Sequence, residues 1–107
     1  MEVKNSFIKK LILKYFEKRN LNIEKIILFG SRASNNHSKY SDWDILIIIK
    51  EQLTTEEKRE IIRELRKDFA HHLIPADIII KNIDEIEYYK NFIGSVTREA
   101  LKEGKIL

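Results

Sequence analysis

The sequence predicts an α/β (α+β) fold in which helices flank a small mixed sheet of three strands. Three apolar runs of strand length indicate the sheet: residues 25–29, 43–49 and 74–80. Segments with helical periodicity lie before, between and after these runs, which gives the order α-β-β-α-β-α. The chain has 107 residues, 43% of them hydrophobic and 35% charged, which suits one compact domain spanning residues 1–107.

The first half of the chain should form a helix and two strands. A helix is expected over residues 3–19, because apolar side chains recur there every four positions. The first strand, residues 25–29, ends at Gly30, and the polar stretch of residues 31–41 predicts a loop with at most one helical turn. The second strand, residues 43–49, is apolar on both faces and is therefore expected at the centre of the sheet.

The second half should contain the third strand between two further helices. Thr54 opens the first of these helices with a capping-box signature. The last helix is expected over residues 84–103, with a kink near Tyr89 or Gly94. Gly104 provides a stop signal at its C-terminal end.

Composition limits the classes of protein. There is no cysteine, which excludes disulfides and thiolate metal sites and fits a reducing compartment. No signal peptide and no apolar run of membrane-spanning length is visible, so a cytoplasmic protein without a membrane role is expected. The net charge of +3 is too small to indicate nucleic-acid binding by itself, and that question stays open.

Two short motifs at strand ends carry the chemical information. Gly30-Ser31 follows the first strand, and after ten residues Asp42-x-Asp44 leads into the second. Asp42 and Asp44 are two residues apart and therefore point to the same side of an extended chain. Asp77 interrupts the third apolar run, where an isolated carboxylate would be costly to bury. If the second and third strands are neighbours, the three carboxylates form one cluster.

Such a cluster favours a divalent cation. Close carboxylates raise one another's pKa, and a bound cation reverses that effect by favouring every ionised ligand. Mg²⁺ suits an all-oxygen site completed by water and phosphates, and two ions shared by Asp42 and Asp44 would clamp the attacking and leaving oxygens of a displacement at phosphorus. Asp77 would ligate the ion beside the attacking hydroxyl or accept its proton. Gly30 and Ser31 would bind phosphate through N–H groups and a hydroxyl, with Arg32 adding a charged contact.

These residues resemble a known signature. Gly30-Ser31, ten residues and Asp42-x-Asp44 is similar to the signature of the nucleotidyltransferase superfamily that includes DNA polymerase beta, and the short chain resembles its minimal nucleotidyltransferase (MNT) branch. Asp77 and the tail over residues 98–104 also look like that family. One departure is Ser34-Asn35-Asn36, where relatives often have a glycine; asparagine tolerates left-handed backbone angles.

The resemblance implies a function. Asp42, Asp44 and Asp77 would be catalytic metal ligands, and Gly30, Ser31 and Arg32 would bind the nucleotide. The enzyme would move a nucleoside monophosphate, AMP if the substrate is ATP, from a nucleoside triphosphate to a hydroxyl. Minimal nucleotidyltransferases are commonly antitoxins of small helical HEPN toxins encoded nearby, and can transfer AMP to a toxin tyrosine.

Two alternatives to this function stay open. One is a non-catalytic antitoxin that neutralises its partner by stoichiometric contact. The other is nucleotidyl transfer to RNA or to a small molecule. An aromatic set near the C-terminus, Tyr88, Tyr89 and Phe92, would form a partner surface or pack in the core, so homo-oligomer formation is also left open. The adjacent pair His71-His72 does not share a helix face and is interpreted as a polar helix end.

Overall fold

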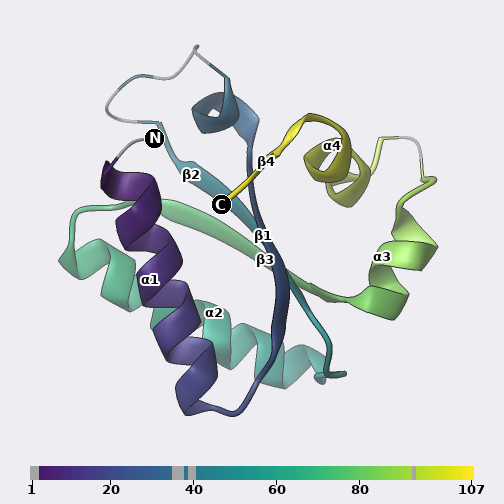
Figure 1. The fold of residues 1–107 in the computed structure, drawn as a ribbon, viewed down its shortest axis with the longest axis horizontal. Coiled ribbons are helices and arrows are strands. Elements are labelled where there is room, and N and C mark those ends of the chain that lie inside the picture. The colour runs from purple at the N-terminus through teal and green to yellow at the C-terminus, as the bar shows by residue number, and fades with distance from the viewer. Residues whose placement is uncertain (1–2, 35–37, 39–40, 93) are drawn as a thin grey trace.

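The computed structural model describes residues 3–34, 38, 41–92 and 94–107 and has the element order expected from the sequence, with one added strand. The elements are α1 (Val3–Lys18), β1 (Ile23–Phe29), the one-turn 3-10 helix η1 (Gly30–Ala33), β2 (Trp43–Ile49), α2 (Thr55–His71), β3 (Ala76–Asn82), α3 (Ile83–Tyr89), α4 (Val96–Glu103) and β4 (Lys105–Ile106). Figure 1 shows the helices on both sides of a single twisted sheet.

The sheet is mixed, as predicted, but has four strands instead of three. Its order is β3-β2-β1-β4, in which β1 pairs antiparallel with β2 and with β4, while β2 and β3 run parallel. The extra strand β4 is only two residues long, too short to show a periodic pattern in the sequence. Leu107 extends this edge by donating its N–H to the Ile26 carbonyl at 2.9 Å.

The central strand β2 is buried on both faces, and this divides the core in two. Ile45, Ile47 and Ile49 pack with the apolar sides of α1 and α2 in the larger cluster. Leu46 and Ile48 face the smaller cluster under α3 and α4. Because these strand residues are at most 4% exposed, the core fixes the register of β2 and with it the position of the residues that precede it.

The predicted C-terminal helix is two helices rather than one kinked helix. Residues 90–95 separate α3 from α4; Gly94 has φ +83°, and Ser95 caps α4 by accepting a hydrogen bond from the Arg98 N–H. Gly104 ends α4 in an extended conformation that any residue can adopt. Glycine is needed there for close packing, because a Cβ would come within 2.3 Å of Ile27 Cγ2. The capping box at Thr54 is confirmed.

A partly buried ion pair joins α2 to the start of α3. Lys58 Nζ lies 2.7 and 2.8 Å from the two carboxylate oxygens of Glu85, which also accepts from the backbone N–H of Asn82. Partial burial tends to raise the pKa of Glu85, but the hydrogen bonds from Lys58 and Asn82 outweigh it and leave the pKa below its usual value. A carboxylate with a lowered pKa in the folded state adds stability above its unfolded pKa and loses it as the pH falls.

The substitution Lys58→Met is therefore expected to lower the free energy of unfolding by about 1 kcal/mol at pH 7, a modest value because the pair is partly solvated. The loss should shrink as the pH falls below 4.5 and then through the lowered pKa of Glu85 in the folded chain, where this carboxylate becomes protonated. Urea titrations at neutral and acid pH measure both effects. Lys90→Met, which removes a more exposed pair with Glu87, is the control and should change little. An equal loss at both pH values would contradict the assignment.

No helix in the described part of the chain is both long enough and apolar enough to cross a bilayer.

Candidate active site

The turn after β1 is built around a glycine that no other residue could replace without movement. Gly30 begins η1 with φ +70°, a left-handed value that L side chains rarely adopt. A Cβ on Gly30 would lie 2.2 Å from the Asp44 Oδ2 atom. The backbone of the turn therefore lies directly against this carboxylate, which requires the absence of a side chain.

The strand registers bring the predicted carboxylates to one end of the sheet. Asp44 is opposite Phe29 in the β1–β2 ladder and opposite Asp77 in the parallel β2–β3 ladder. The Trp43 N–H donates to the Pro75 carbonyl at 2.8 Å and extends the parallel pairing by one bond. Residues in register on neighbouring strands point to the same face, so Asp44 and Asp77 lie side by side, next to the turn at Gly30.

The electrostatics of the cluster favour a bound cation. Asp44 is half-buried, whereas Asp42 and Asp77 are exposed. Partial burial, followed by the negative charges of Asp77 and Asp42, raises the pKa of the Asp44 carboxyl. The cluster thus gathers negative charge at one point, and its hard oxygen donors suit Mg²⁺. Within the described residues, no three acidic or histidine side chains converge closely enough to form a complete metal cage by themselves.

Arg32 holds the turn against the loop that leads to the aspartates. Its Nε and Nη2 atoms donate to the Ser41 carbonyl at 3.2 and 3.1 Å, and its guanidinium stacks over the Trp43 ring at 4.4 Å. The same side chain was predicted to contact nucleotide, so its contacts with Ser41 and Trp43 add an anchoring role. Ser31 is half-buried beside Gly30. The departure at Asn35-Asn36 lies outside the described residues.

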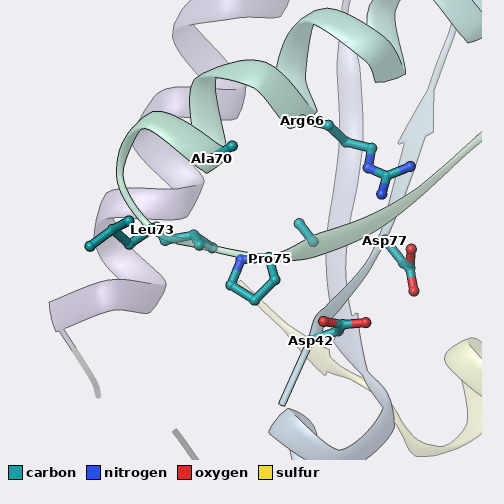
Figure 2. A pocket seen from close by; sticks show the side chains of 8 residues that line it. Asp42, Arg66, Ala70, Leu73, Pro75 and Asp77 are labelled. Carbon is teal, nitrogen blue, oxygen red and sulfur yellow. The ribbon is translucent and has the colours of Figure 1, made fainter. Parts of the chain in front are cut away.

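A pocket of about 380 Å³ opens beside the carboxylates at the β3 edge of the sheet. Its lining comes from the end of α2, the connection to β3, and the two exposed aspartates: Asp42, Arg66, Ala70, Leu73, Ile74, Pro75, Ala76 and Asp77. Figure 2 shows the Asp42 and Asp77 carboxylates at one side of the pocket and Arg66 extending from α2 over β3. Sequence reasoning missed this lining, because Arg66 is one of many basic residues on the solvent side of an amphipathic helix.

Several aromatic and histidine side chains contact other parts of the protein or lie on its surface. Trp43 is 1% exposed and packs in the core. His72 is exposed and makes an edge contact with Phe7 at 4.8 Å between ring centroids. Tyr88 and Tyr89 at the end of α3 and Phe92 just beyond it form a cluster of edge-to-face and tilted ring contacts, with Tyr88 62% and Phe92 45% exposed.

Comparison with known proteins agrees with this arrangement. Residues 10–107 match the family model described as polymerase beta, nucleotidyltransferase. A protein of Methanocaldococcus jannaschii, provisionally named a protein adenylyltransferase, is 36% identical over an alignment of 74 positions that covers 63% of this chain and 75% of that protein.

Solved structures share the fold at low sequence identity. A chain of a toxin–antitoxin complex with AMP-PNP aligns with a TM-score of 0.58 at 19% identity, covering 91% of this chain and 69% of its own. A chain of a complex between a tri-AMPylated HEPN toxin of Shewanella oneidensis and its MNT antitoxin aligns with a TM-score of 0.54 at 18% identity, covering 94% of this chain and 69% of its own.

Proposed function

This chain belongs to the polymerase beta nucleotidyltransferase family, and from that premise we propose that it transfers AMP from ATP to a hydroxyl group of a partner protein. The observation that carries the proposal is the register that sets Asp44 beside Asp77 and against the Gly30 turn. That arrangement places the carboxylates directly against the tight glycine turn that follows β1. The 36% identical relative named as a protein adenylyltransferase supports AMP as the transferred group.

The residues divide the work between the nucleotide and the acceptor. Gly30 and Ser31 bind the triphosphate through N–H groups and the Ser31 hydroxyl. Asp42, Asp44 and Asp77 would hold Mg²⁺, which when bound neutralises developing charge on the phosphates. The acceptor oxygen attacks the α-phosphorus, the bond from that phosphorus to the bridging oxygen breaks, and pyrophosphate leaves. Asp77 is exposed beside the pocket and accepts the proton of the attacking hydroxyl.

The proposed partner is a small helical HEPN-type protein, with this chain as the antitoxin of the pair. Two observations support it: the fold is shared with chains of toxin–antitoxin complexes, and one of those complexes contains an AMPylated toxin. The proposed compartment is the cytoplasm, where ATP and Mg²⁺ are supplied.

The decisive experiment follows the label of ATP. The chain is incubated with Mg²⁺, the neighbouring gene product, and ATP radiolabelled at either the α- or the γ-phosphate. AMP transfer predicts that the partner acquires α-label and no γ-label, and that changing the acceptor tyrosine to phenylalanine abolishes the signal. Label from the γ-position would indicate phosphorylation instead. Neutralisation of the partner without any label would favour the stoichiometric antitoxin, and label on RNA added to the mixture would favour nucleotidyl transfer to RNA.

A further inference from the structure

Helices α1 and α2 end in the same backbone motif but with different residues at its key position. In both, an N–H reaches back five residues to the carbonyl of a buried phenylalanine (Leu21 to Phe16 at 3.0 Å, Ile74 to Phe69 at 2.9 Å). The residue just before that N–H has φ +58° in each helix: Asn20 in α1 and Leu73 in α2. The chain thus contains two copies of one left-handed helix ending.

Leucine is a poor choice for this conformation. Asparagine visits left-handed angles readily, whereas the Cβ of an ordinary L-residue crowds the following carbonyl there. Burial does not compensate for the strain at Leu73, because its side chain is 86% exposed. Folding stability alone would therefore favour asparagine or glycine at this position, as in α1. A strained and exposed apolar residue points to selection for contact with another molecule.

Leu73 lies at the candidate active site. It lines the pocket that Asp42 and Asp77 border, together with Pro75 and Ala70 (Figure 2). One side of this pocket is therefore apolar and the other carries carboxylates. A ligand that fits both sides has an apolar body and a polar tip, and among the hydroxyl-bearing side chains that could accept AMP this describes tyrosine.

The sheet order indicates that this pocket receives the acceptor and not the leaving group. The Gly30 turn flanks Asp44 from the β1 side, whereas the pocket flanks Asp77 at the β3 edge. In phosphoryl-type transfer the attacking and leaving oxygens lie roughly in line on opposite sides of the phosphorus. If pyrophosphate leaves over the Gly30 turn, the acceptor hydroxyl must approach from the side of β3.

We propose that Leu73 and Pro75 form the wall against which a tyrosine ring of the acceptor protein packs, with its hydroxyl directed toward Asp77. This inference rests on the proposed function, because it assigns the acceptor side of the same reaction. Leu73 therefore determines acceptor specificity. It is exposed in the free protein because its side chain is covered only when the tyrosine ring is bound. Arg66 lines the same pocket, and the aliphatic part of its side chain could cover the ring from α2.

The test uses N-acetyl-L-tyrosinamide as the probe for the pocket and AMP-PNP as the probe for the nucleotide turn. Binding of each is followed by amide chemical shifts of the isotopically labelled full chain. We expect the tyrosine probe to shift Ala70 and Ala76, and AMP-PNP with Mg²⁺ to shift Gly30 and Ser31. In Leu73→Asn, the Kd of the tyrosine probe should rise at least about tenfold through lost apolar contact, while AMP-PNP binding is unchanged.

Measurements of thermal stability provide an independent readout, because Leu73→Asn should weaken tyrosine binding without lowering the unfolding temperature. Leu73→Asn should unfold at the same or a higher temperature than the native chain, because asparagine suits φ +58°. The matched variant Asn20→Leu should unfold at a lower temperature and bind the tyrosine probe normally. N-acetyl-L-serinamide, which lacks the ring, should show no detectable binding to the native chain or to either variant.

The possible failures can be distinguished. Tyrosine-probe shifts elsewhere on the chain, or an unchanged Kd in Leu73→Asn, would overturn the inference even if AMP transfer is found. Absence of AMP-PNP shifts with normal tyrosine binding at Ala70 and Ala76 would instead count against the proposed function and leave the docking wall supported.

Discussion

The double substitution Asp42→Asn with Asp44→Asn is expected to reduce AMP transfer by roughly 10³-fold or more, since it removes about 4 kcal/mol of stabilisation of charge at the reacting phosphate. The same change should increase thermal stability. Partial burial and the neighbouring carboxylates raise the pKa of Asp44, so its ionised form opposes folding at neutral pH. A carboxyl with a raised pKa favours folding while protonated, and this contribution is lost as the pH rises through the folded pKa.

The gain in stability should therefore be larger at pH 7 than at acid pH, where the native Asp44 is already protonated. Transfer rates with α-labelled ATP and thermal unfolding monitored by circular dichroism measure the two effects. Asp68→Asn on the exposed side of α2 is the control and should leave both unchanged. Transfer that persists in the double variant would remove the carboxylates from the mechanism. A loss of stability would show that they are held by compensating contacts instead.

Gly30→Ala is expected to lower both the rate of transfer, by roughly 10²-fold, and the free energy of unfolding, by about 1–3 kcal/mol. Two effects act together. The left-handed φ of +70° is strained for alanine, and its Cβ would lie 2.2 Å from the Asp44 Oδ2 atom. The turn or the carboxylate must move, and a displacement of about 1 Å at a reacting centre has a large effect on rate.

Gly94→Ala separates these two effects. Gly94 also has a left-handed φ, +83°, but nothing lies within 4 Å of the position its Cβ would take. This control should lose about 1 kcal/mol of stability through backbone strain alone and keep full activity. Chemical denaturation and initial transfer rates measure both variants. Equal activities for the two variants would show that the contact between Gly30 and Asp44 is not needed for catalysis.

The sequence allowed much of this arrangement to be anticipated because strand registers follow from apolar patterns. The uninterrupted apolar run of β2 requires a central strand, and that placement sets Asp44 at the point where the strand enters the core. The interruption of the next run by Asp77 was informative for the same reason. The parallel pairing of β2 with β3 follows from the intervening helix α2, which forms the crossover between them.

The features that escaped prediction depend on contacts between distant parts of the chain. The two-residue strand β4 exists because β1 offers a free edge, which no local pattern reveals. Glycine is required at position 104 because of its close contact with Ile27, and not because of its backbone angles. Leu73 looks like an ordinary apolar residue until its φ and its 86% exposure are known together.

The burial of β2 has a consequence for hydrogen exchange. Ile45, Leu46 and Ile47 are completely inaccessible to solvent and are paired with strands on both sides, so we expect their amides to be among the slowest to exchange. Asp44 directly precedes this segment and shares its ladders, so Asp44 and Asp77 have no inexpensive local route to separate. The proposed phosphate-reacting centre is therefore tied to the most buried strand, whereas the proposed acceptor wall at Leu73 lies just past the end of α2, where its side chain is 86% exposed. We therefore expect amides next to Asp44 to exchange as slowly as the core, and amides next to Leu73 to exchange faster.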